Sequence, residues 1–157
     1  MLFRSQGYEY NGYWRDIGTI RSFYETNLEM TRPNPPFDIF DQSLRLYTHA
    51  RFLPGSQLGN CNLHDVLIAE GCGIQDATIE HYVIGLRSMI KCGARIKDSV
   101  LMGADFYDDS GDIPMGIGVN CDIEGAIIDK NCRMGANVVV KPFPLGTELE
   151  TDMYSVK

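Results

Sequence analysis

The residues of this chain that are best suited to chemistry are its histidines and cysteines. Histidine can act as a general base or as a zinc ligand, and the chain has three, His49, His64 and His81. The five cysteines match no CxxC or zinc-finger spacing, and their number is odd. We therefore expect reduced thiols, in a cytosol-like compartment.

Charge and hydropathy exclude two classes of partner. The 157 residues carry a formal net charge of −7, and the isoelectric point is near 4.8. An acidic chain without a basic stripe repels phosphate backbones, so we expect no nucleic-acid binding. No apolar run approaches the roughly 20 residues that span a bilayer, so we expect no membrane partner.

Residues 1–31 predict a short strand followed by a helix. Residues 8–14 are rich in aromatic side chains and read as strand-like, and a helical period follows within residues 17–28. Thr19 or Asp16 is suited to cap that helix, and the prolines that begin at Pro33 stop it. Residues 32–37 therefore read as a proline-rich linker. The predicted apolar face of the helix consists of Ile17, Ile20, Phe23, Tyr24 and Leu28.

Residues 38–157 carry a repeat of six residues. Aliphatic residues recur at this spacing, and a small or aliphatic residue usually stands two positions earlier, with Tyr82 the misfit. Such hexads predict a mainly β fold, a left-handed parallel β-helix whose coils take about three hexads, or ~18 residues, each. The inward positions run from Ile68 to Ile74; through Ile84, Ile90, Ile96 and Met102; from Ile117 to Ile123; and through Ile128, Met134 and Val140.

Breaks in the repeat and its small residues complete this prediction. The phase is lost at residues 75–83 and again at 104–114, and the second, acidic stretch reads as a loop outside the coil. Gly85, Gly93 and Gly103 suit corners of the coil. The cysteines at positions 72, 121 and 132 stand where small apolar residues are needed, so we interpret them as core residues rather than redox or metal groups.

Several segments, in order, resemble glucose-1-phosphate adenylyltransferases (ADP-glucose pyrophosphorylases) of the plant and cyanobacterial type. Residues 12–20, GYWRDIGTI, are similar to the GYWxDIGT segment of that family. The resemblance continues through residues 84–88 (IGLRS), 101–107 (LMGADFY), 116–118 (GIG) and 126–131 (AIIDKN).

This resemblance implies a reaction, and it shows which parts of the family's catalytic domain the present sequence lacks. Family members join ATP to glucose 1-phosphate, releasing pyrophosphate and ADP-glucose for glycogen or starch synthesis, with two aspartates holding Mg²⁺. Asp16 matches the second of them, although it could equally cap the following helix. The chain lacks the family's GGGxGTRL loop, first metal aspartate and FVEKP-like segment, so residues 1–31 correspond to the end of the nucleotidyltransferase domain. We expect the chain alone to be inactive and without a cofactor.

The resemblance also implies a regulatory residue. Lys130 matches the family lysine that binds phosphorylated metabolite effectors, and its ammonium would act as a point charge on a phosphate. A solvated lysine beside Asp129 is the alternative. A second basic effector residue is missing downstream, so we expect weak affinity. The cations Arg87, Lys91, Arg95 and Lys97 could form a basic face or simply a solvated surface.

Partners and alternatives follow from the same residues. An open β-helix edge favours self-association, and a complete adenylyltransferase subunit is the other expected partner. We expect a cytoplasmic protein, or a plastid one in a plant or alga. The resemblance implies that the chain is the C-terminal regulatory and oligomerisation region of an enzyme of this family. The alternative function is a stand-alone hexapeptide acyltransferase with His81 as its base. The zinc-binding hexapeptide class needs a late histidine pair, and no histidine follows His81.

Overall fold

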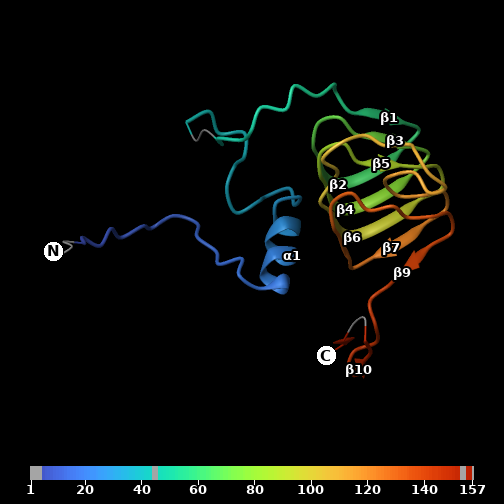
Figure 1. The fold of residues 1–157 in the computed structure, drawn as a ribbon. Coiled ribbons are helices and arrows are strands. Elements are labelled where there is room, and N and C mark those ends of the chain that lie inside the picture. Colours follow the sequence, from blue (N-terminus) through green and yellow to red (C-terminus); the bar gives the residue numbers. More distant parts are fainter. Residues whose placement is uncertain (1–4, 44–45, 153–154, 157) are drawn as a thin grey trace.

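The structure, a computed structural model, describes residues 5–43, 46–152 and 155–156. One helix precedes a stack of short strands, and a small hairpin follows the stack near the C-terminus (Figure 1). The elements are α1 (Ile20–Glu29), β1 (Gln57–Gly59), β2 (Asn62–Ile68), β3 (Gly73–Gln75), β4 (Thr78–Ile84), β5 (Met89–Ile90), β6 (Arg95–Leu101), β7 (Asp122–Glu124), β8 (Ile127–Ile128), β9 (Val139–Val140), β10 (Leu149–Glu150) and β11 (Ser155–Val156).

The strands from β1 to β9 wind into the parallel β-helix that the repeat predicts. One sheet has the order β1-β3-β5, and the other has β2-β4-β6-β7-β9, with β8 beside β6. From one coil to the next, Gln57 pairs with Gly73, and Thr78 pairs with Arg95. Both steps are shorter than the ~18 residues expected from three full hexads, because some sides of the coil are one residue short of a hexad.

Three columns of aliphatic side chains fill the interior. Each column contributes one residue per coil, and parallel pairing stacks them in register. The columns are Ile74, Ile90 and Ile117; Ile79, Ile96 and Ile123; and Ile84, Leu101 and Ile128, all of them buried.

The short sides account for two errors of the predicted repeat. The interior residue after Ile96 is Leu101, whereas Met102, which we predicted to point inward, is exposed. The stretch at residues 75–83 continues the coil, since Ile79 follows Ile74 across such a short side and is fully buried. A strict spacing of six cannot follow a coil that shortens a side by one residue.

The misfit Tyr82 is a core residue. Its side chain is fully buried, and its neighbours in register are Val66 on one coil and Ser99 on the next. These smaller side chains leave the volume that a phenol ring needs. Burial raises the pKa of the Tyr82 hydroxyl.

The corners of the coil require unusual backbone conformations. Gly93 and Gly103 have φ values of 76° and 89°, as expected for glycines at corners. Gly85 serves close approach instead, because a Cβ there would lie 2.5 Å from the carbonyl of Met102. At another corner the left-handed residues His81 (φ 51°) and Asp98 (φ 45°) follow one another on successive coils.

Residues 104–114 leave the coil, as predicted. The coil that contains them is longer than the one before it, since Ile90 faces Ile117, whereas Ile74 faces Ile90. Arg133 holds the far end of the loop: its Nη1 donates to the carbonyls of Ser110 (3.0 Å) and Ile113 (2.8 Å), and its Nη2 contacts the carboxylate of Asp108.

In the N-terminal segment the predicted helix is present, but the predicted strand is not. Thr19 is the N-cap, and Ser22 completes the capping box. The helix ends at Glu29, ahead of the prolines. Of the predicted apolar face, Ile17 precedes the helix and Ile20 is exposed, so the packed residues are the other three. Residues 8–14 form no strand, because no strand in the described part of the chain pairs with this segment.

Candidate functional site

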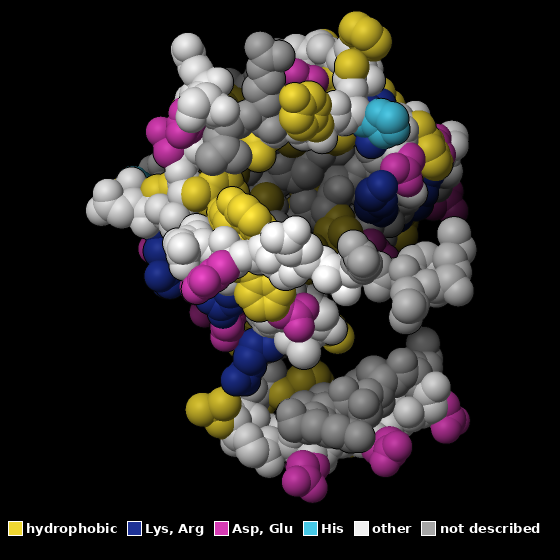
Figure 2. Space-filling model, turned by 90° about the vertical axis from the view of Figure 1, so that its left-hand side faces the viewer, with side chains coloured by type: hydrophobic (Ala, Val, Ile, Leu, Met, Phe, Trp, Pro, Cys, Tyr) yellow, Lys and Arg dark blue, Asp and Glu magenta, His cyan; other side chains and the backbone are white. Residues whose placement is uncertain are grey.

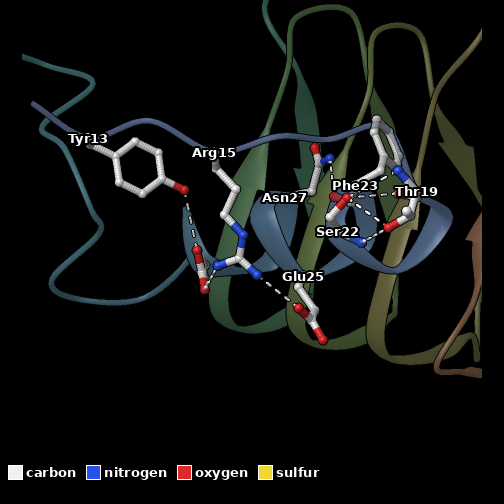
Figure 3. Close-up of polar contacts among 8 residues, drawn as sticks. Tyr13, Arg15, Thr19, Ser22, Phe23, Glu25 and Asn27 are labelled. Atoms are coloured by element: carbon white, nitrogen blue, oxygen red, sulfur yellow. Dashed lines mark hydrogen bonds and ion pairs between the residues drawn. The ribbon is translucent and has the colours of Figure 1, made fainter. Parts of the chain in front are cut away.

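Asp16 lies on a short segment that is clamped to helix α1. Arg15 reaches across to two glutamates of the helix, with Nη2 at 2.9 Å from Glu25 and Nη1 at 2.8 Å from Glu29 (Figure 3). Tyr13 donates to the same Glu29 carboxylate at 3.4 Å. These contacts hold the chain that leads into the helix, and with it Asp16.

The carboxylate of Asp16 is used locally. Its Oδ1 accepts a hydrogen bond from the backbone N–H of Gly18 at 2.8 Å, an Asx turn just ahead of the helix. Since Thr19 is the N-cap, Asp16 does not cap the helix itself. No group of three or more His, Cys, Asp or Glu side chains that could hold a metal occurs among the residues that the structure describes. Asp16 can supply one carboxylate to a metal.

Helix α1 rests on the β-helix through the corner that carries His81. The His81 Nδ1 lies 2.6 Å from the Asp98 carboxylate, and Nε2 lies 3.2 Å from the carbonyl of Leu28 in the last turn of the helix. Tyr24 donates from its hydroxyl to the backbone carbonyl of Asp98. Both partners of His81, the Asp98 carboxylate and the Leu28 carbonyl, are acceptors. This histidine joins two elements of the fold, and both of its ring nitrogens lie against groups of the fold.

A groove of about 1720 Å³ opens between the helix and the β-helix. Its walls are partly apolar, with Ile17, Ile20 and Phe23 from the helix side and Met102, Ile127 and Pro142 from the coil. Figure 2, which views the molecule from the side that carries the N-terminal segment, shows hydrophobic side chains beside a hollow.

Lys130 follows strand β8 and meets the start of the 104–114 loop. Its Nζ lies 2.9 Å from Oδ1 of Asp105, and Asn131 Nδ2 donates to Oδ2 of the same carboxylate at 3.0 Å. The backbone N–H of Asp105 donates in turn to Oδ1 of Asn131 at 2.8 Å. The backbone N–H of Lys130 donates to Asp129 at 2.7 Å.

Arg87 joins this cluster from the preceding coil. Its Nη1 donates to the carbonyl of Ala104 at 3.2 Å. Hydrogen bonds from Lys130 and Asn131, together with the charges of Lys130 and Arg87, hold the pKa of Asp105 below its usual value. We call Arg87, Lys130 and Asn131, with the Asp105 carboxylate they surround, the loop cluster. It brings the sequence-predicted residue Lys130 together with other charged groups of the coil.

The predicted basic face does not form as a single patch. Arg87 belongs to the loop cluster, while Arg95 lies 3.5 Å from Asp122. Lys97 stands in register between Glu80 and Glu124, so charges alternate along that column. Arg95 and Lys97 are therefore surface residues among acidic neighbours.

The partner of Lys130 was missed from the sequence, although a signal was present. Asp105 opens the acidic loop, far ahead of Lys130 in the chain, and the two side chains form an ion pair. The loop lengthens its coil, so that Ile90 faces Ile117 and the two charged side chains fall on adjacent coils. The separation of Asp105 and Lys130 in the sequence predicts their contact only when the length of this coil is known.

The predicted structural role of the cysteines agrees with their positions. Cys72 and Cys121 are buried in the coil, Cys132 is half-buried, and all five cysteines are free. Burial raises the pKa of the Cys72 and Cys132 thiols, which keeps them in the neutral form.

Comparison with known proteins places the fold in a family. Residues 51–157 match the model of the GLGC left-handed parallel β-helix domain. The chain is also 46% identical, over an alignment of 166 residues, to the glucose-1-phosphate adenylyltransferase small subunit, chloroplastic/amyloplastic, of Triticum aestivum. That alignment covers 98% of this chain and 35% of the relative, so the chain spans about a third of its length. Within the described ranges, no helix is long and apolar enough to cross a membrane.

Proposed function

The chain belongs to the family of GLGC left-handed parallel β-helix domains, and on that basis we propose that it is the regulatory and assembly region of a glucose-1-phosphate adenylyltransferase. The reaction is the synthesis of ADP-glucose from ATP and glucose 1-phosphate, with release of pyrophosphate, for starch or glycogen. The family match and the 46% identity to an adenylyltransferase small subunit support this proposal over the acyltransferase alternative. The engagement of both His81 nitrogens supports it too.

Catalysis in this proposal belongs to a nucleotidyltransferase domain outside the present sequence. A phosphoryl-type transfer needs phosphate-binding loops and Mg²⁺ more than it needs covalent help, and this chain has no Gly-rich phosphate loop. Bound Mg²⁺ supplies charge neutralisation on the phosphates. Asp16 contributes one carboxylate, and the Arg15 clamp on helix α1 holds that carboxylate in position relative to the β-helix.

Regulation in this proposal acts through Lys130 and a phosphorylated metabolite. The observation that carries it is the loop cluster: a carboxylate already pairs with the ammonium of Lys130, with an amide and a guanidinium beside it. Groups that hold a carboxylate in this way can also hold a phosphate.

The partner in this proposal is a complete adenylyltransferase subunit or a second copy of the chain. The relative is named a small subunit, which supports association with another subunit. The relative's name also supports a plastid location over a cytoplasmic one.

The test is an assay of pyrophosphate release from ATP and glucose 1-phosphate with Mg²⁺, for the purified chain alone and mixed with a complete adenylyltransferase. We expect no activity alone and a changed response to phosphate-ester activators in the mixture. The variant Lys130→Ala should associate normally but leave the activator response unchanged. Activity of the chain alone, or a mixture that behaves as the complete enzyme does by itself, would contradict the proposal.

A further inference from the structure

We propose that Asp105 is an internal occupant of the anion site at Lys130, and that a phosphate-bearing ligand binds there by displacing its carboxylate. This inference rests on the proposed regulatory function, because it concerns the same lysine. It adds the residue that competes with the ligand and the segment that responds, the start of the 104–114 loop.

The first step is the way in which the carboxylate of Asp105 is held. Each of its oxygens receives its own donor, Lys130 Nζ on Oδ1 at 2.9 Å and Asn131 Nδ2 on Oδ2 at 3.0 Å. The donors come from the turn after β8, and the acceptor comes from the loop. The carboxylate therefore lies on the coil as a bound anion would.

The charges around Asp105 favour a phosphate group at this position. Lys130 pairs with the Asp105 carboxylate, and the guanidinium of Arg87 donates to the carbonyl of the preceding residue, Ala104. The charges of both cations lower the pKa of Asp105. Asp129 is the other acid at this turn, and its Oδ1 is occupied by the backbone N–H of Lys130. When Asp105 leaves, two cations face one remaining carboxylate. A phosphate group, with up to two negative charges and three acceptor oxygens, suits that site better than one carboxylate does.

The third step is that the internal contact is exchangeable. The Lys130 side chain is 49% exposed and that of Asp105 is 53% exposed. Ion pairs this open to water contribute little to stability, because water and salt screen them. A ligand that offers a stronger anion can therefore take the place of Asp105 without disturbing the coil.

Displacement of Asp105 should affect only the start of the 104–114 loop. Arg133 anchors the far end of the loop at Ser110 and Ile113, and Tyr107 donates from its hydroxyl to the carbonyl of Gly71 at 2.8 Å. These contacts do not involve the carboxylate of Asp105. Displacement should free the Asp105 backbone N–H from Asn131 while the rest of the loop stays in place.

The experiment is a calorimetric titration with inorganic phosphate at constant ionic strength, on the full chain and three variants. Asp105→Asn removes the competing charge, and Lys130→Ala removes the site. Asp112→Asn is the matched control: it removes the same charge from the same loop, where its carboxylate makes no hydrogen bond or ion pair with any residue in the described part of the chain. We expect Asp105→Asn to bind phosphate about three- to tenfold more tightly, Asp112→Asn within about twofold of the parent, and Lys130→Ala not measurably.

A second readout follows the loop directly. Amide exchange measured by NMR should show the Asp105 N–H losing protection when phosphate is added to the parent chain. The Met115 N–H, which donates to the carbonyl of Asp108 at 3.2 Å, should keep its protection.

The outcomes separate this inference from the proposed function. If Lys130→Ala abolishes binding but Asp105→Asn binds no more tightly, or no more tightly than Asp112→Asn, the role of Asp105 is overturned and the regulatory lysine stands. If Lys130→Ala binds phosphate as the parent does, or if neither the parent nor Asp105→Asn binds it, both proposals fall. Unchanged exchange at Asp105 on saturation with phosphate would also overturn displacement.

Discussion

Helix α1 and the 104–114 loop both lie against the outside of the β-helix, but different contacts hold them there. We call the first the helix junction, made by Tyr24 and Leu28 with His81 and Asp98. Leu28 is only 4% exposed, and two of the three polar contacts end on backbone carbonyls. A buried side chain and backbone acceptors make a junction that salt screens little.

The second, which we call the loop junction, holds the 104–114 loop largely through charged side chains that are open to water. Its ionic contacts are the loop cluster and the pairing of Arg133 with Asp108, and they involve partly or largely exposed side chains. Tyr107 and Arg133 add hydrogen bonds to backbone carbonyls. An anion in solution can compete for these cations, whereas no ligand of that kind replaces the buried Leu28. The comparison indicates that the helix junction keeps the geometry of the molecule and that the loop junction is the one able to respond to a ligand.

The largest effect expected on this comparison comes from Leu28→Ala. Truncating a buried leucine costs about 2–5 kcal/mol, and here the loss should fall on the docking of helix α1. Hydrogen exchange should show lower protection for the helix amides, with strands β4 and β6 unchanged. The control is Ile20→Ala, in the same helix, where the side chain is 81% exposed and the change should stay within about 0.5 kcal/mol. Equal loss of protection in β4 and β6 would show that helix and coil unfold as one unit and would break the comparison.

A smaller effect is expected from His81→Asn. Asparagine tolerates the left-handed backbone at this corner, so the variant removes the contact with Leu28 without straining the coil. Loss of this hydrogen bond to the last turn of the helix should weaken docking by about 1 kcal/mol, again read from exchange of the helix amides. His64→Asn changes an exposed histidine of β2 that makes no side-chain hydrogen bond in the described chain, and it should have no effect. Identical exchange in the two variants would remove His81 from the junction.

Much of the coil was predictable from the sequence, because a β-helix repeats the same environment. The positions Ile84, Ile90, Ile96, Ile117 and Ile123 follow the hexapeptide spacing and are all buried. The prediction failed where a side is one residue short, at Met102 and in the stretch at residues 75–83. The length of one side depends on how the chain turns at its corner. Asp and His are enriched at left-handed positions such as Asp98 and His81, but they also occur widely elsewhere, so their presence alone does not mark a corner.

The site was less predictable than the coil, for a different reason. The sequence singled out Lys130 and Arg87 separately, and the structure brings both to Asp105. Contacts between adjacent coils depend on the length of the inserted loop, which local patterns do not encode. The strand predicted at residues 8–14 is absent for a similar reason: its residues favour a strand, but the described ranges offer it no partner strand.

The smallest effect expected is a response of the loop junction to acid. Hydrogen bonds from Lys130 and Asn131 lower the pKa of Asp105, and those from Ser110, with the charge of Arg133, lower the pKa of Asp108. A carboxyl whose pKa is lower in the folded state than its usual value of 3.8 stabilises the fold fully above 3.8, and that contribution is lost as the pH falls through the folded value. Backbone NMR signals of the loop should therefore stay constant from neutral pH down to about 5 and shift only in more acidic solution. The double variant Asp105→Asn, Asp108→Asn should lose this acid response, because it has no carboxylate left at either contact. A loop that shifts near neutral pH, or a double variant that responds as the parent does, would mean that these two ion pairs do not hold it.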